Sequence, residues 1–200
     1  MDMTPVNTIA LLQDLRKQIV AAQYKAESRF GEKSSAMLQH QPQPGKWSAL
    51  QCLEHLNTYG RFYLPALDKA ITEAEQKGSQ PTPVFRSSWL GAWFTKQMQP
   101  QPDGQLRSRM KSPKGHLPAV QPDEETVINE FVQQQQMMEA LMLRAEKINL
   151  QQAKVATSLS RFIRLSVGDT FGFMTAHINR HVLQAEKAIS TCQQQVKKTV

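Results

Sequence analysis

Apolar residues recur at the spacing of an amphipathic helix in four long stretches of this chain. The clearest stretch begins at Ser48, which forms a capping box with Gln51, and its leucines repeat every three or four positions to about Lys77. Three further stretches show the same period, at residues 5–38, 123–147 and 169–194. No β-type alternation is apparent, so the pattern predicts an all-α fold, a four-helix bundle.

Local signals suggest where these helices begin and end. Thr4 and Pro5 are a suitable N-cap and first helical residue for the first helix, and Asp169 is a suitable N-cap for the last. Pro65 falls inside the second helix, where it removes one backbone hydrogen bond, and Gly78 is expected to end that helix.

A long crossover, residues 79–122, is expected to join the second and third helices, because it holds seven of the 11 prolines. We expect residues 84–98 to form a short extra helix within it, and residues 148–168 to be a second connection. The length suits one domain over residues 1–200. The predicted buried face of the extra helix is aromatic: Phe85, Trp89, Trp93 and Phe94.

The chain is basic, with a formal net charge of +7 from 24 lysines and arginines against 17 acidic residues. Part of the excess lies between Asp103 and Asp123, where the basic residues are Arg107, Arg109, Lys111 and Lys114. Such a region either attracts an anionic ligand or nucleic acid, or is a solvated face. Because no nucleic-acid motif accompanies it, we favour the solvated face.

The two cysteines, Cys52 and Cys192, lie far apart and form neither a disulfide framework nor a paired-cysteine zinc motif. This usage suits a reducing compartment. The first residues lack the pattern of a signal peptide, and no apolar stretch is long enough for a transmembrane helix. We therefore expect a cytoplasmic protein with no membrane association.

Three histidines are candidate metal ligands. His177 and His181 are four residues apart in the last helix, so both leave the same face, and His55 lies among apolar residues of the second helix. Histidines at this spacing also occur by chance on solvated faces. If all three are buried, however, one divalent cation would satisfy them together, and three neutral imidazoles leave a coordination position open.

Other polar residues share these helix faces. Gln184 could orient a ligand or make an ordinary helix hydrogen bond, and Arg180 could hold an anionic substrate or pair with a surface carboxylate. The candidate pocket walls on the second helix lie within about one turn of His55 and are Gln51, Thr58 and Tyr59.

Other residues near the three histidines are not expected to bind the metal. Cys52 lies one turn from His55 and is a potential fourth ligand, although a small core residue is the simpler interpretation. Glu54 points away from His55 and is not expected to be a general base. The proline-containing loops carry His40 and His116, which we expect at the surface and outside the metal site. The extra helix could cover the pocket with Trp89 and Trp93.

Three segments of the sequence resemble the DinB/YfiT-like family. They are PGKWSALQCLEHL at 44–56, KSPKGHLPAVQPDEE at 111–125 and HINRHVLQAEK at 177–187. The most specific feature is the distant helical histidine combined with the pattern H-x-x-R-H-x-x-Q.

The resemblance implies a four-helix bundle with a long crossover, and nickel or zinc bound by His55, His177 and His181. It also implies an enzyme, either a hydrolase or a thiol transferase, that acts on a small-molecule substrate, in the second case with a low-molecular-weight thiol. A non-catalytic metal-binding or stress-associated bundle is the alternative. The aromatic residues of the crossover are compatible with a homodimer.

Overall fold

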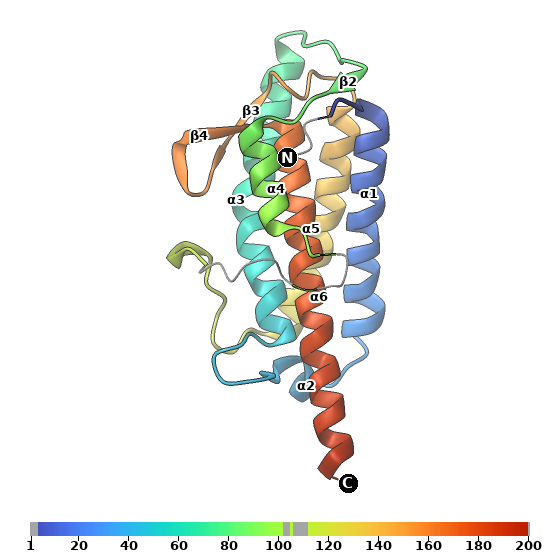
Figure 1. Ribbon diagram of the computed structural model, residues 1–200, viewed down its shortest axis with the longest axis vertical. Coiled ribbons are helices and arrows are strands. Elements are labelled where there is room, and N and C mark those ends of the chain that lie inside the picture. The colour runs from blue at the N-terminus through green and yellow to red at the C-terminus, as the bar shows by residue number, and fades with distance from the viewer. Residues whose placement is uncertain (1–3, 102–104, 106–111, 200) are drawn as a thin grey trace.

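The computed structural model describes residues 4–101, 105 and 112–199, and it is mostly helical, as the sequence predicts. Figure 1 shows the elements in space. The longest helices are α1 (Thr8–Lys25), α3 (Ala49–Gln76), α5 (Glu124–Ala145) and α6 (Val167–Thr199). The shorter ones are the π-helix η1 (Ala26–Phe30), α2 (Ser35–Gln39), α4 (Trp89–Met98) and the 3-10 helix η2 (Lys114–His116). The strands are β1 (Val6–Asn7), β2 (Val84–Phe85), β3 (Lys154–Thr157) and β4 (Ser160–Ser166).

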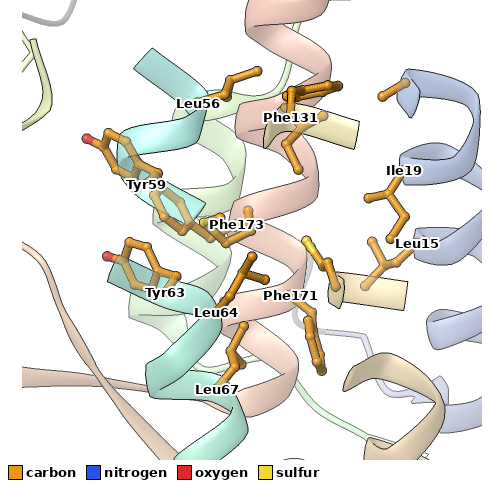
Figure 2. Close-up of a cluster of buried hydrophobic side chains, with 14 of the residues drawn as sticks. Leu15, Ile19, Leu56, Tyr59, Tyr63, Leu64, Leu67, Phe131, Phe171 and Phe173 are labelled. Carbon is orange, nitrogen blue, oxygen red and sulfur yellow. The ribbon is translucent and has the colours of Figure 1, made fainter. Parts of the chain in front are cut away.

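The four long helices pack side by side around one apolar core. Helices α1 and α3 each pack against both α5 and α6, and α4 covers a further face of α6. Helix α3 runs antiparallel to α6 (Figure 1). Between them, Tyr59, Tyr63 and Phe173 lie next to the aliphatic core, and the two tyrosine hydroxyl groups point away from it on the same side (Figure 2).

Helix α3 begins as its sequence predicts. The Ser48 hydroxyl oxygen accepts a hydrogen bond from Gln51 N at 3.2 Å, and Gln51 Oε1 accepts one from Ser48 N at 3.1 Å. Pro65 lies inside the helix, and Gly78, with a φ of 68°, follows its last turn.

The predicted start of the first helix is wrong. Helix α1 begins at Thr8, and its N-cap is Asn7, whose side chain accepts a hydrogen bond from Ala10 N at 2.9 Å. The cause is a tertiary contact: strand β1, immediately before the helix, pairs antiparallel with β2 from the crossover. Strand pairing therefore holds Val6 and Asn7 in an extended conformation, although the sequence assigned both residues to the helix.

The same pairing shortens the extra helix of the crossover, which begins at Trp89 rather than at residue 84. Phe85 and Phe94 are buried, as expected, and Trp93 is half-buried. Trp89, by contrast, is 66% exposed.

Asp169 is not the N-cap of the last helix, which already begins at Val167. Its carboxylate is buried and accepts hydrogen bonds from the hydroxyl groups of Ser87, Ser88 and Ser166. Since Ser88 is also the N-cap of α4, this carboxylate fastens the start of α4 to the start of α6.

The connection at residues 148–168 contains an antiparallel hairpin that the sequence did not predict. Strands β3 and β4 pair across a tight turn, in which Ser160 N donates to Thr157 Oγ1 at 3.4 Å. The alternation of apolar and polar residues in the sequence of β4 is weak, because Phe162, in the middle of the strand, is 82% exposed. An apolar residue that faces solvent removes the period-two signal.

Among the described residues, no helix is both long and apolar enough to cross a membrane. Within the basic region of the crossover, Arg107, Arg109 and Lys111 lie outside the described residues.

Candidate metal centre

His55 of α3 meets His177 and His181 of α6 inside the bundle. Each offers one ring nitrogen such that the three atoms lie within 4.8 Å of one another. The ring centroids are 5.1 Å apart for His55 and His177, 4.6 Å for His55 and His181, and 4.7 Å for the pair on α6. Thus the antiparallel packing of two helices brings together residues that are more than 120 positions apart.

All three rings are buried, with exposed fractions of 3% for His55, 2% for His177 and 7% for His181. Burial lowers the pKa of His55 to about 4, and it lowers the pKa values of His177 and His181 well below 6.5. The mutual proximity of the rings and the positive charge of Arg180 lower the last two further. The imidazoles are therefore neutral at physiological pH, the form that binds metal ions.

The tautomer of His55 is fixed by the crossover. Its Nδ1 lies 2.6 Å from the carbonyl oxygen of His116, and a carbonyl only accepts, so Nδ1 carries the proton. The lone pair is then on Nε2, which lies 3.2 Å from Nε2 of His177. Two nitrogens bound to one zinc ion at about 2.0–2.1 Å in tetrahedral geometry would lie about 3.3 Å apart.

The other two histidines each have a nitrogen in need of a partner. Nδ1 of His177 and Nδ1 of His181 are buried and accept or donate no hydrogen bond among the described residues. Unpaired buried polar atoms are costly and are rare in native structures. The separation of the ring nitrogens fits a shared divalent cation, and for His177 the nitrogen that faces His55 is Nε2, not the unpaired Nδ1.

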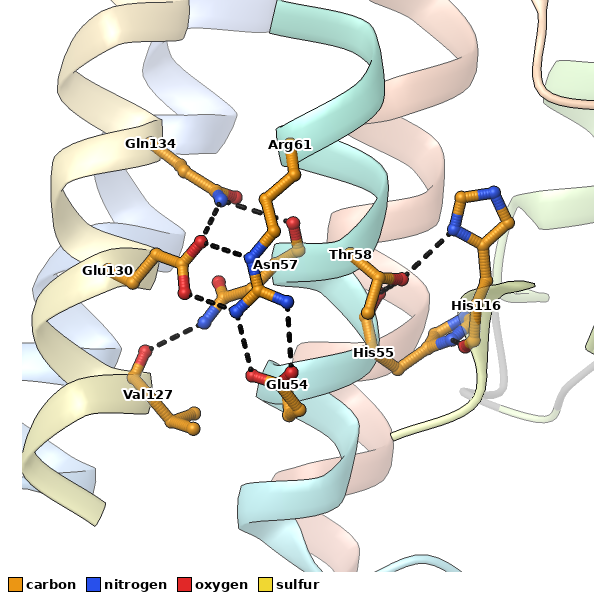
Figure 3. Close-up of polar contacts among 9 residues, drawn as sticks. All are labelled: Glu54, His55, Asn57, Thr58, Arg61, His116, Val127, Glu130 and Gln134. Atoms are coloured by element: carbon orange, nitrogen blue, oxygen red, sulfur yellow. Dashed lines mark hydrogen bonds and ion pairs between the residues drawn. The ribbon is translucent and has the colours of Figure 1, made fainter. Parts of the chain in front are cut away.

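His116 does not lie at the surface as expected; it is only 8% exposed and belongs to the surroundings of His55. The Thr58 hydroxyl donates to the carbonyl oxygen of His55 at 2.7 Å, so its oxygen accepts from His116 Nδ1 at 3.1 Å (Figure 3). The His116 ring also stacks on Tyr59, with centroids 4.0 Å apart. These contacts hold the crossover against α3 and fix the carbonyl that orients His55.

Tyr59 lies between the histidines and the aromatic residues beyond them. The centroid of its ring lies 5.1 Å from that of His55 and 4.4 Å from that of His177. Burial raises its pKa to about 12, so the phenol stays protonated at neutral pH. Among the described residues its hydroxyl group has no hydrogen-bond partner, and it faces away from the aliphatic core (Figure 2).

Two further candidates, Gln184 and Arg180, lie beside the cluster. Gln184 raises the pKa of the neighbouring His181 slightly, against the larger lowering by burial, which favours the orienting interpretation. Arg180 is 6% exposed rather than at the surface, and its Nη1 donates to the carbonyl oxygen of Gln97 at 3.4 Å. Burial lowers its pKa.

Gln51 serves the crossover and not the pocket. Beyond its part in the capping box, its Nε2 donates to the carbonyl oxygens of Ala119 at 3.3 Å and Val120 at 3.1 Å. It therefore acts on the cluster indirectly, because it fastens to α3 the same crossover that presents the His116 carbonyl.

Cys52 and Glu54 do not join the metal centre. Cys52 is fully buried in the apolar core, and burial raises the pKa of its thiol. Glu54 is paired with Arg61, which also binds Glu130 of α5 (Figure 3). Both findings agree with the simpler interpretation of each residue.

A cavity of about 640 Å³ opens on the three histidines. One end is formed by the loop before α3, which includes Lys46 and Trp47, and the Trp47 ring lies 4.7 Å from that of His55. The other end lies under the β3–β4 hairpin, where Ser158 N donates to the Tyr63 hydroxyl at 3.0 Å. Neither Trp89 nor Trp93 lines it, so these tryptophans do not form the expected cover.

Sequence reasoning missed two of these walls, Trp47 and the hairpin, and it missed the contact of His116 with His55. Trp47 directly precedes the helix cap, so its position was a usable signal. The hairpin and His116 reach the site through tertiary contacts with α3 that carry no local signature.

The family model of the DinB superfamily matches residues 18–185. That span covers most of the chain and includes all three histidines, so the chain belongs to the DinB superfamily, which confirms the resemblance seen in its motifs. No curated protein and no solved structure matches this chain.

Proposed function

We propose that this DinB-superfamily protein is a divalent-metal-dependent enzyme, with His55, His177 and His181 as the metal ligands. The observation that carries the proposal is a cluster of three neutral, buried imidazoles that opens on a cavity large enough for a small molecule. In the same proposal, the four long helices are the four-helix bundle of the family, and residues 79–122 are its long crossover.

A divalent cation held by these residues would supply Lewis acidity, which lowers the pKa of a bound water or thiol. The chain contributes the arrangement around it. His116, through its carbonyl oxygen, keeps the His55 lone pair on Nε2, and Gln184 orients His181. Tyr59 presents a protonated hydroxyl group that can donate a hydrogen bond to an oxygen of the substrate.

Hydrolysis and thiol transfer both remain within the proposal, with zinc or nickel as the metal. Among the described residues that line the cavity there is no aspartate or glutamate to act as a general base. Thiol transfer needs such a base less than hydrolysis does, because a thiol is far more acidic than water. We therefore place transfer from a low-molecular-weight thiol first and hydrolysis second.

The alternative, a non-catalytic metal-binding or stress-associated bundle, calls for a closed site without a pocket. The cavity of about 640 Å³ at the three histidines argues against it.

The direct test is metal analysis of the purified protein after incubation with zinc or nickel and desalting. We expect about one metal ion per chain in the parent, and a loss of metal in His55→Ala, His177→Ala and His181→Ala. His40→Ala is the matched control, because His40 lies outside the cluster. Retention of metal by all three variants would refute the ligand assignment.

If metal is bound, an activity panel separates the reactions. Low-molecular-weight thiols are offered with electrophiles in one arm, and esters and amides in the other. A product in either arm that disappears in His181→Ala assigns the reaction, while a metal-loaded protein inactive in both favours the non-catalytic alternative.

Three further expectations accompany the proposal. The free, buried Cys52 and Cys192 suit the reducing cytoplasm. A single domain over residues 1–200 and a homodimer remain predictions, which limited proteolysis and sedimentation would test.

A further inference from the structure

The cavity of about 640 Å³ has an apolar end under the β3–β4 hairpin. We call it the hairpin end, and among the described residues its apolar and aromatic wall consists of Tyr63, Phe94, Leu159, Leu165 and Phe173. The ring centroid of Phe173 lies 5.7 Å from that of Tyr63 and 5.8 Å from that of Phe94. Helices α3, α4 and α6 and the hairpin therefore converge on one apolar wall.

This wall continues directly into the proposed metal centre. The Phe173 ring stacks on that of His177, with centroids 5.8 Å apart and an angle of 13° between the ring planes. On the facing helix, the Tyr59 centroid lies 6.1 Å from that of Tyr63 and 4.4 Å from that of His177. A ligand group at the hairpin end is therefore next to a proposed metal ligand.

The polar atoms near the hairpin end are already bonded within the protein. Ser158 N donates to the Tyr63 hydroxyl oxygen at 3.0 Å, and that hydroxyl donates to Ser158 Oγ at 3.4 Å. Thr157, which also lines the cavity, donates from its hydroxyl to the carbonyl oxygen of Ser160 at 3.2 Å. A polar ligand group at the hairpin end would lose its hydrogen bonds to water and gain few in exchange.

The hairpin end also carries no charge among the described residues that form it. Tyr63 is ionisable, but burial raises the pKa of its phenol, which stays protonated at neutral pH. The arginines of the hairpin, Arg161 and Arg164, are exposed and do not line the cavity. A charged ligand group would therefore lose its hydration at the hairpin end without meeting a counter-ion.

We infer that the molecule bound in this cavity carries an uncharged apolar group, which occupies the hairpin end beside His177. Contact of this group with Phe173, Leu159 and Leu165 removes apolar surface from water, which stabilises the complex. The inference rests on the proposed function only where it takes this molecule to be the substrate, whose reacting part then lies at the three histidines.

The test measures binding to the metal-free protein, so that it does not depend on an enzymatic reaction. The probes are the unbranched amides from pentanamide to octanamide, together with 8-hydroxyoctanamide, and NMR titration gives their dissociation constants. Each added methylene should tighten binding about three- to fourfold. The terminal hydroxyl group should weaken binding about tenfold or more relative to octanamide, because it finds no free partner at the hairpin end.

A pair of variants on the hairpin locates the effect. Leu159 is 55% exposed at the rim of the cavity, and Leu159→Ser should weaken octanamide binding at least about threefold. Phe162→Ser is the matched control, because Phe162 belongs to the same hairpin, is 82% exposed and does not line the cavity. It should leave the affinity at the parent value.

Three results would overturn the inference. They are an affinity that does not increase along the amide series, equal binding of octanamide and its hydroxyl analogue, and an equal loss in the two hairpin variants. The outcome is separable from that of the proposed function. Chain-length dependence in a protein that never binds zinc or nickel would remove the enzyme and leave the apolar site, whereas metal bound by the three histidines without such dependence would do the reverse.

Discussion

Acidification should destabilise the metal-free protein in a pH range where carboxylates hardly titrate. The unfolded chain takes up a proton on His55 near pH 6.5, but the folded chain does so only near pH 4. Between these values protons bind the unfolded state preferentially, so the stability is complete above pH 6.5 and is lost as the pH falls toward 4.

The size of the effect follows from the pKa shift. For a histidine with pKa values of 6.5 unfolded and about 4 folded, the free energy of unfolding decreases by about 2 kcal/mol between pH 7 and pH 5. The pKa values of His177 and His181 are lowered well below 6.5 as well, by burial first. Both histidines therefore add to the loss in the same direction.

Urea denaturation of chelator-treated protein at pH 7, 6, 5.5 and 5 measures this loss. In His55→Gln, which cannot take up the proton, the decrease should be smaller by about 2 kcal/mol. His40→Gln serves as the control and should behave like the parent. A free energy of unfolding that is constant from pH 7 to pH 5 would contradict the burial of neutral histidines, and with it the argument for the metal centre.

Three further perturbations test single contacts. Gly91→Ala places a Cβ 2.1 Å from Asp169 Cγ, so we expect a loss of about 2 kcal/mol or more in urea denaturation; a stable variant would mean that α4 is loosely held. Thr58→Val removes the acceptor of His116 Nδ1 and should weaken zinc binding about tenfold in a chelator competition, whereas unchanged affinity would show that the His116 contact does not orient His55. Arg144→Met breaks two exposed ion pairs and should cost less than about 1 kcal/mol; a larger loss at high salt would assign Arg144 a packing role.

The sequence was most informative where structure is local. The capping box at Ser48 and Gln51 and the apolar period after it are properties of a few neighbouring residues, and α3 follows both. The two histidines one turn apart on α6 share a face for the same reason. The contact of these two histidines with His55 depends on how α3 and α6 pack. Periodicity indicates this packing only indirectly, because it places all three histidines on apolar helix faces.

Predictions failed where a tertiary contact overrides the local preference. Residues 4–7 could start a helix, but pairing with β2 extends Val6 and Asn7. Aspartate is a favourable N-cap residue, yet the Asp169 carboxylate instead accepts hydrogen bonds from Ser87 and Ser88 at the start of α4. The hairpin was missed because Phe162 and Ile163 face solvent, which removes the alternation of a half-buried strand.

One of these failures, the hairpin, also forms part of the cavity wall. The proposed metal-binding nitrogens come from α3 and α6, the helices that periodicity reveals, whereas part of the cavity wall comes from connections: the loop at Lys46, the crossover at Pro113 and the hairpin. A connection can change length and composition without disturbing the helical core. It follows that the cation's chemistry depends on the bundle and the choice of ligand on the connections, so Leu159→Ser should alter ligand affinity while zinc affinity stays at the parent value. If zinc affinity also fell, the hairpin would be part of the metal centre, and this division of roles would be wrong.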